Sequence, residues 1–373
     1  MKRWIAGVIS LVLICATAPA VLCEESISVS AQSAVVIDAL TGSILYQKNA
    51  HQKRSVASTT KIMTTLLALE QGDLNQEIVT TKEMVTVEGS GMGLLPGDSV
   101  SLEELCYGMM LSSGNDAANT VATVIAGSLA HFADRMNQKA VLLNLNNTHF
   151  VTPSGLDAQH HYSTAYDMAL LTRYALQNPT FCKMAAAQKT KVTYGNPPYR
   201  RTLTNHNRLL KEYEGCIGVK TGFTKKAGRC LVSAATREGA TVICVTLSAP
   251  DDWNDHKRLL DYGFNKVEKV SFKTETRWLP VVGATTDRVK LSHQSLDIWL
   301  PSYKKGICSV QWQISPFLYA PVPAGKTMGT FSVLLEGTPI ASTPIVAQET
   351  AVPVSVPGFF KRWKQNLVGM LKN

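Results

Sequence analysis

The chain has 373 residues, 45% of them hydrophobic and 17% charged, which excludes a disordered, collagen-like or low-complexity protein and allows two domains with substantial cores. The formal net charge is +9, but Lys2 and Arg3 contribute +2 and the four cations of residues 351–373 contribute +4, so +3 remains for the rest. Nucleic-acid-binding proteins spread basic residues over a folded face. Because the excess positive charge lies at the two ends of the chain, it argues against a nucleic-acid partner and for a membrane partner.

The N-terminal residues predict an export signal. Lys2 and Arg3 precede an apolar run from Trp4 to Cys15, and small residues at 16–20 suit a signal peptidase. The run is short for a membrane-spanning helix. We interpret residues 1–20 as a cleaved signal peptide, with retention as an anchor the less favoured alternative.

The cysteines do not predict a disulfide framework. Of the eight cysteines, Cys15 lies in the signal and seven follow it, an odd number without any C-x-x-C spacing. Most lie in apolar contexts, where a buried cysteine acts as a small hydrophobic residue. One bridged pair is left open.

Residue patterns beyond the signal predict an α/β domain over 21–267. Alternating apolar residues with turn signals predict two hairpins, and helical spacing predicts a helical middle followed by one further helix. Because strands lie at both ends with helices between them, we expect a mainly antiparallel sheet. The predicted hairpins are 34–46 and 230–247, and the predicted helices are 58–71, 102–110, 116–128, 131–143 and 255–264.

From about residue 274 the pattern changes to short β-prone runs broken by Gly and Pro. These runs predict a small β-rich domain over 274–350, with a boundary near 266–274. They are 277–282, 287–291, 309–314 and 330–335.

The final stretch, 351–373, predicts an amphipathic helix starting near Gly358. At 100° per residue, aromatic and aliphatic side chains such as Phe359, Trp363 and Leu367 gather on one arc, with the cations outside it. Such a helix can lie in a membrane interface without crossing the bilayer. Docking on the chain's own β-rich domain is the alternative.

A candidate nucleophile and base occur in Ser58-Thr59-Thr60-Lys61. Residues three apart share a helix face, so the Lys61 amine can reach the Ser58 hydroxyl. That amine can remove the hydroxyl proton if burial or a nearby cation lowers its pKa. The pattern alone is a weak signal, because Ser302 and Lys305 match it too.

Two later motifs make the first one specific. Ser113-Gly114-Asn115 is the only Ser-x-Asn of the chain, and Lys220-Thr221-Gly222 is the only Lys-Thr-Gly. They supply a second hydroxyl, an amide and a cationic strand. With Asp in place of Gly in the second motif, this trio is the signature of penicillin-binding proteins and class A β-lactamases.

The chain further resembles low-molecular-weight penicillin-binding proteins that are D-alanyl-D-alanine carboxypeptidases. The resemblance covers roughly residues 30–265. It rests on the three motifs, the stretch from Ser113 to Arg173 with Thr152-Pro153-Ser154-Gly155-Leu156-Asp157, and Phe223-Thr224 with Ala227-Gly228. It implies a penicillin-binding transpeptidase/β-lactamase-like catalytic domain.

The resemblance also implies a role for each motif residue. Ser58 would be the acylated nucleophile, Lys61 its base, Ser113 a proton relay and Asn115 a holder of the network. Lys220 and Thr221 would clamp the substrate carboxylate, and the backbone N–H groups of Ser58 and Phe223 would form the oxyanion hole. Gly222 would let an extended substrate approach the strand edge.

Other chemistries fit less well. The chain has no G-x-S-x-G and no H-E-x-x-H, and we interpret His160, His161 and His206 as structural. Arg201, Arg229 and Arg237 could lend charge to the carboxylate pocket, but by default we interpret them as surface residues.

Two alternatives to a carboxypeptidase remain open. Class A β-lactamases need a deacylating glutamate between the second and third motifs. Only Glu212 and Glu214 lie there, too near the third motif. The other alternative is a catalytically idle wall-binding protein, which the intact motifs disfavour.

The expected protein is an exported serine D-Ala-D-Ala carboxypeptidase. It would act on peptidoglycan stem peptides ending in D-Ala-D-Ala, be inhibited covalently by β-lactams, and need no metal or organic cofactor. It would be attached peripherally to the outer face of the bacterial cytoplasmic membrane by its C-terminal helix.

Overall fold

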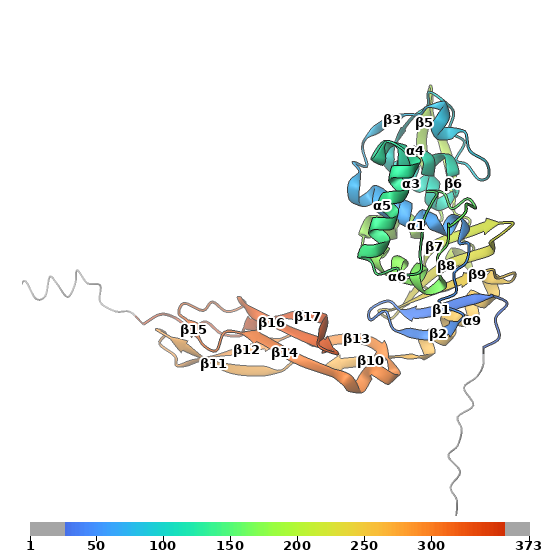
Figure 1. The fold of residues 1–373 in the computed structure, drawn as a ribbon. Coiled ribbons are helices and arrows are strands. Elements are labelled where there is room, and N and C mark those ends of the chain that lie inside the picture. The colour runs from blue at the N-terminus through green and yellow to red at the C-terminus, as the bar shows by residue number, and fades with distance from the viewer. Residues whose placement is uncertain (1–26, 355–373) are drawn as a thin grey trace, which may run out of the picture.

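A computed structural model describes residues 27–354. The predicted signal peptide, Cys23 and the predicted C-terminal helix lie outside the described residues. The described chain forms an N-terminal domain, residues 27–265, from which a second unit of strands extends (Figure 1). We call this second unit, residues 267–354, the β-module.

A five-stranded antiparallel sheet organises the N-terminal domain in the order β2-β1-β9-β8-β7. Its apolar side chains pack on helices on one face and on α9 on the other, so the central strands are buried. The predicted hairpins and the last predicted helix are confirmed. The elements are β1 (Ser33–Asp38), β2 (Ile44–Lys48), β7 (Cys216–Thr224), β8 (Gly228–Arg237), β9 (Ala240–Leu247) and α9 (Asp252–Asn265).

Helices cover the face of this sheet opposite α9. Apolar side chains of α1, α3, α4 and α6 meet in one core with the sheet, and capping side chains fix where helices begin, as in the Ser101–Glu104 capping box of α3. The elements are η1 (Ala57–Thr60), α1 (Lys61–Gln71), α2 (Lys82–Val85), α3 (Leu102–Leu111), α4 (Asn115–Ala126), α5 (Leu129–Leu142), α6 (Ala165–Ala175), α7 (Pro179–Ala186) and α8 (Leu209–Glu212).

The predicted helix 58–71 begins later than expected. Residues 57–60 form a 3-10 turn, and the α-helix starts at Lys61. Ala57, just before the predicted start, has φ +47°, a left-handed conformation that an α-helix cannot include, so no helix runs into residue 58 from the preceding chain. Ser58 therefore lies in a tight turn before the helix.

A second, four-stranded sheet lies at the far end of the helical layer (Figure 1). It was not predicted, because its strands come from separated stretches and the β5–β6 hairpin carries mostly polar residues. Its order is β3-β4-β5-β6, with β3 (Glu77–Val79), β4 (Ser99–Ser101), β5 (Lys189–Gly195) and β6 (Pro198–Thr204).

The β-module is all-β, as predicted, with an apolar core of its own. A six-stranded sheet, β14-β16-β17-β12-β11-β15, is antiparallel except for the β11–β15 pair, and β10 pairs with β13. The strands are β10 (Val267–Phe272), β11 (Thr276–Val282), β12 (Arg288–His293), β13 (Leu296–Pro301), β14 (Cys308–Ile314), β15 (Leu318–Tyr319), β16 (Thr327–Leu335) and β17 (Thr338–Ala347), with the 3-10 turn η2 (Ser302–Ile307).

The module is larger than the predicted span of 274–350. Its first strand starts at Val267 because β10 pairs with β13. At the other end, Ala351 pairs with Val322 and Pro353 with Ala284. Residues 267–273 and 351–354 therefore belong to the module.

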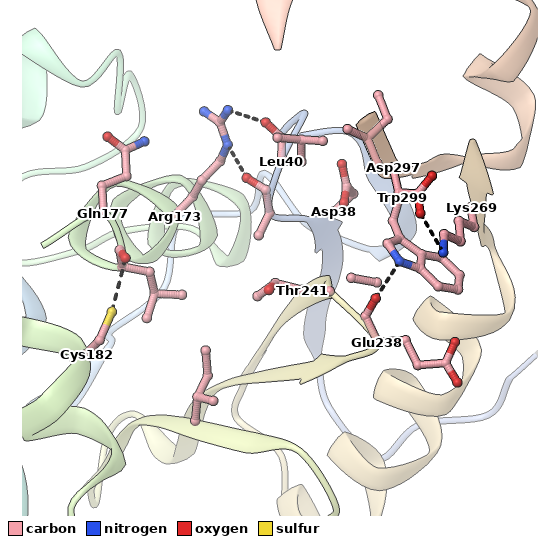
Figure 2. A pocket seen from close by; sticks show the side chains of 16 residues that line it. Asp38, Leu40, Arg173, Gln177, Cys182, Glu238, Thr241, Lys269, Asp297 and Trp299 are labelled. Atoms are coloured by element: carbon pink, nitrogen blue, oxygen red, sulfur yellow. Dashed lines mark hydrogen bonds and ion pairs between the residues drawn. The ribbon is translucent and has the colours of Figure 1, made fainter. Parts of the chain in front are cut away.

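A cavity of about 580 Å³ lies where the two units meet. Figure 2 shows its walls: Trp299 Nε1 donates to the Glu238 carbonyl at 2.7 Å, and Lys269 pairs with Asp297 at 2.8 Å. Arg173 donates to the carbonyls of Ala39 and Leu40. Since its polar groups largely pair with one another, we treat this cavity as part of the junction.

Six cysteines lie in residues 27–354, and all six are free thiols: Cys106, Cys182, Cys216, Cys230, Cys244 and Cys308. Within that same range, no helix combines the length and apolar character needed to cross a bilayer.

Candidate active site

The Ser58 turn is held between the sheet and a glycine loop. A 3-10 turn has three residues per turn, so Ser58 and Lys61 lie one directly above the other. Gly155 packs behind the turn: a Cβ at this position would come within 1.9 Å of the Ala57 carbonyl oxygen. The Thr152–Leu156 stretch thus needs glycine at 155 to press the turn into place.

Lys61 is the centre of the polar network. Its Nζ lies 3.0 Å from Ser58 Oγ, 2.7 Å from Asn115 Oδ1 and 2.8 Å from the Ser154 carbonyl oxygen. The side chain has no exposed surface. Burial, and then the neighbouring Lys220 cation, hold the pKa of Lys61 well below the usual lysine range, against the opposing effect of Asp116. A neutral amine beside a serine hydroxyl is thereby accessible.

Ser113 and Lys220 form a second pair facing the first. Lys220 Nζ donates to Ser113 Oγ at 3.1 Å and to the Thr221 carbonyl at 3.0 Å. Ser113 has φ +58°, which turns the chain between α3 and α4. Lys220 is 1% exposed, and burial lowers its pKa to about 7. The structure thus brings together the lysines of the first and third motifs.

Asn115 and Asp116 fasten the loop 88–94 beside the groove. Asn115 begins α4, and its Nδ2 donates to the Glu88 carbonyl at 2.7 Å. The Asp116 carboxylate accepts the backbone N–H groups of Met92, Gly93 and Leu94, each near 3.0 Å. Sequence reasoning missed Asp116, because an acid in a first helical turn is ordinary.

Gly222 is where strand β7 meets the Ser58 turn. A Cβ on Gly222 would lie 3.1 Å from the backbone nitrogens of Ser58 and Thr59 and from the Val56 carbonyl oxygen, tighter than ordinary contact. The glycine therefore lets β7 approach the nucleophile's own backbone. That Gly222 also lets an extended substrate approach the strand edge stays a prediction.

A groove of about 310 Å³ opens over Ser58. Motif residues Ser113, Thr221, Gly222 and the exposed Phe223 line it, together with five residues from outside the three motifs, of which the sequence had offered only Arg229 as a possible contributor to the site. These are Ser90, His206, Arg229, Asp252 and Trp253.

Arg229 is the one groove-lining cation with an exposed side chain. It stands opposite Phe223 in the β7–β8 ladder, and its Nε and Nη2 both donate to Asp252 Oδ1, at 2.9 and 2.8 Å. Trp253 lies 5.4 Å from the guanidinium. The side chain is 41% exposed, as expected of a surface arginine, and it also lines the groove. Arg201 and Arg237 do not line the groove.

The histidines differ in position. His161 Nδ1 accepts the Val151 N–H at 3.0 Å, so its Nε2–H can donate to Thr60 Oγ1, also at 3.0 Å. Burial lowers the pKa of His161 to about 4. His161 is thus a neutral structural group, whereas His206 lines the groove, and burial followed by Lys220 lowers its pKa.

Within residues 27–354, no three His, Cys, Asp or Glu side chains are grouped so that they could hold a metal ion.

Proteins of known family are similar to this chain in sequence and fold. The family model for D-alanyl-D-alanine carboxypeptidase matches residues 19–251. The chain is 30% identical to the D-alanyl-D-alanine carboxypeptidase DacF of Bacillus subtilis, over 97% of this chain and 98% of that protein.

Solved structures of penicillin-binding proteins are also similar to this chain. Penicillin binding protein 5 from Haemophilus influenzae is 27% identical, with a TM-score of 0.63, over 87% of this chain and 98% of that one. The Streptomyces K15 DD-transpeptidase is 34% identical, with a TM-score of 0.62, over 64% of this chain and 98% of that one. The chain therefore belongs to the D-alanyl-D-alanine carboxypeptidase family and is a serine hydrolase with the penicillin-binding fold.

Proposed function

We propose that this enzyme removes the terminal D-alanine from peptidoglycan stem peptides through an acyl-enzyme on Ser58. The observation that carries the proposal is Lys61 Nζ at 3.0 Å from Ser58 Oγ, in a fully buried position that favours the neutral amine. A neutral amine at hydrogen-bond distance is what a general base for a serine requires.

In the acylation step, neutral Lys61 takes the Ser58 proton while Oγ bonds to the penultimate D-alanine carbonyl carbon. The C–N bond to the terminal D-alanine then breaks, and the proton that Lys61 took passes by way of Ser113 to the departing nitrogen, which leaves Lys61 neutral again. Ser113 Oγ accepts a hydrogen bond from Lys220. In deacylation neutral Lys61 takes a proton from water as the water oxygen bonds to the acyl carbon, and it returns that proton to Ser58 Oγ as the ester C–O bond breaks. We assign the oxyanion hole to the backbone N–H groups of Ser58 and Phe223.

A β-lactam presents the same kind of amide carbonyl to Ser58. Opening the ring leaves the amine attached to the acyl group, so no leaving group departs. Among the groove-lining residues the one carboxylate is Asp252, and it is held by Arg229. No lining carboxylate is thus left to activate a deacylating water, which favours a trapped drug over β-lactamase turnover.

The carboxylate of the substrate needs an accessible cation. Lys220 is buried and bonded to Ser113 and the Thr221 carbonyl, so we assign it to the proton relay. Arg229, with Thr221 beside it on the neighbouring strand, is the better carboxylate ligand: Nε and Nη2 share one Asp252 oxygen, and Nη1 has no hydrogen bond among the described residues. A guanidinium fork suits a carboxylate.

The deciding experiment joins two measurements on the mature enzyme. Intact mass after treatment with benzylpenicillin should rise by one drug molecule, and a peptide ending in D-Ala-D-Ala should release D-alanine. A mass shift with no D-alanine release, but transfer to an amine acceptor, would indicate a transpeptidase. Rapid loss of the adduct with drug hydrolysis would indicate a β-lactamase. Neither adduct nor release would leave the wall-binding alternative.

The residue types at the two ends of the chain support a proposal for the cellular place of the enzyme. We infer export through residues 1–20 and peripheral attachment to the outer face of the cytoplasmic membrane through the basic, amphipathic residues 358–373. This fits a substrate that lies outside the cell membrane. Vesicle binding by the intact mature chain, lost on removal of those residues, is the supporting result.

A further inference from the structure

Exposed apolar side chains gather at the end of the β-module farthest from the N-terminal domain. They are Val282 (50% exposed), Phe317 (42%), Tyr319 (69%), Val352 (54%) and Val354 (50%). We call these five residues the apolar tip. Figure 1 shows β11 and β15 at this remote end, where the described chain finishes.

Backbone hydrogen bonds hold these side chains in one surface. Val282 pairs with Tyr319 in the parallel β11–β15 ladder, and the Val354 N–H donates to the Gly283 carbonyl at 2.8 Å. The rings of Phe317 and Tyr319 meet edge to face, with centroids 5.4 Å apart. The tip is thus a built surface of three neighbouring segments, rather than a set of loose loops.

The tip carries little charge. Segments 282–287, 315–326 and 351–354 contain only Asp287 and Lys326 as charged residues. Beside the tip, Arg288 stands opposite Pro280, on the same sheet face as Val282, and Glu349 lies farther along, near Lys290. Aromatic and aliphatic side chains flanked by an arginine suit the boundary between acyl chains and anionic headgroups.

The tip also lies where the chain leaves the module. Val354 is separated from Gly358, the start of the predicted amphipathic stretch, by residues 355–357. The four residue steps from Val354 to Gly358 span at most about 14 Å. If residues 358–373 lie in a membrane interface, as we proposed above, the tip is brought within about that distance of the same bilayer.

We propose that the apolar tip is a second membrane-contacting surface, which inserts its aromatic side chains at the lipid headgroup level. The β-module then stands on the bilayer at this end, and the N-terminal domain is held at the other. This inference builds on membrane attachment by the tail but concerns a separate surface, and it does not depend on the enzyme's activity.

The test is binding of the intact mature chain to vesicles of phosphatidylglycerol and phosphatidylcholine. Phe317→Ser/Tyr319→Ser should weaken binding about tenfold or more, because two exposed rings no longer transfer out of water. Ile307→Ser/Val310→Ser is the matched control at the module's other end, where the two side chains are 49% and 44% exposed. That control should bind like the parent. D-alanine release from a soluble peptide should be unchanged in both variants.

Further outcomes separate the possible occupants of the tip. Equal binding by the tip variant and the parent would overturn the proposal, as would a parent that binds no vesicles. If the tail instead covers the tip, lipid-free intact chain will protect backbone amides near 317–319 that a chain ending at Val354 leaves unprotected. If a second copy covers it, the parent will sediment as a dimer and the tip variant as a monomer. If the intact chain binds vesicles and a chain ending at Val354 does not, the affinity for vesicles comes from the tail and not from the tip.

Discussion

The two units of the molecule bury different kinds of side chain. The N-terminal domain encloses two lysines, Lys61 and Lys220, and the carboxylate of Asp116. In the core of the β-module, the one buried ionisable side chain among the described residues is His293, which stacks on Phe331 with centroids 3.7 Å apart. Because burying a charge is costly unless it is paired, the first domain gives up stability for reactivity. The β-module keeps an apolar core without buried lysines or carboxylates among its described residues, as a domain with a structural role would.

The sharpest test of this contrast is Ser58→Ala. We expect kcat for D-alanine release to fall on the order of a millionfold, because the covalent route disappears. Thermal stability should hardly change, since Ser58 contributes one hydroxyl to the network. Intact mass with benzylpenicillin checks the assignment. A drug adduct on the same tryptic peptide of the alanine variant would show that another residue is the nucleophile.

Lys61→Arg should remove nearly all acylation, because a guanidinium does not deprotonate at any working pH. In the native enzyme, the lowered pKa of Lys61 means that kcat/KM rises with pH as this amine loses its proton. It should fall again around pH 7 as Lys220 becomes neutral. Stopped-flow acylation against pH tests both limbs. Parental rates in the arginine variant would rule out the neutral-amine mechanism.

Asp116→Asn should cost roughly 2 kcal/mol of unfolding free energy, because an amide NH₂ now faces backbone N–H donors. It should also move the rising limb of the pH profile to lower pH, since the Asp116 charge raises the Lys61 pKa. Chemical denaturation and kcat/KM profiles measure the two effects. Asp134→Asn, an exposed acid on α5, is the control and should change neither. A stable variant with an unmoved profile would contradict the assigned coupling.

Arg229→Gln should raise KM for a D-Ala-D-Ala peptide by roughly tenfold to a hundredfold, a loss typical of a hydrogen bond to a charged group. The same peptide with an amidated C-terminus should be affected little, so the preference for the free carboxylate should shrink. Arg237→Gln is the control: it lies on the same strand, pairs with Asp261 and does not line the groove. If Arg229→Gln keeps the full preference for the free carboxylate over the amide, then Lys220 and Thr221, and not Arg229, bind the substrate carboxylate.

The smallest effect is expected from removing the tail. A chain ending at Val354 should keep full activity on soluble peptides, because the groove is built entirely within the N-terminal domain. The structure also sets the position of the cut: ending at Thr350 would delete the bridges from Ala351 to Val322 and from Pro353 to Ala284. A large loss of kcat in the chain ending at Val354 would mean that the tail acts on the active site.

The sequence carried more information about the motifs than about their surroundings. Helical spacing, hairpin turns and the order of three motifs predicted the main sheet, most helices and a common site for Ser58, Ser113 and Lys220. The sequence offered Arg229 only as one of three arginines that could lend charge to the site, because Arg229 meets Asp252 through packing of α9 on β8, a contact that no local spacing reports. The Ser58 turn was read as ordinary helix, since a positive φ at an alanine leaves no mark in residue type.

Gly155 and Gly222 both pack against the Ser58 turn, and a side chain at either would meet the backbone at that turn. This geometry restricts how the enzyme could evolve resistance to penicillins. Gly222 lines the groove, and a substitution that narrows the site there displaces the nucleophile as well, so it sacrifices the native reaction together with the drug. Variation that excludes the drug and spares the turn is left to the groove wall, at side chains such as Phe223 and Trp253. The part of the site that a β-lactam must touch is also the part that mutation can least afford to alter.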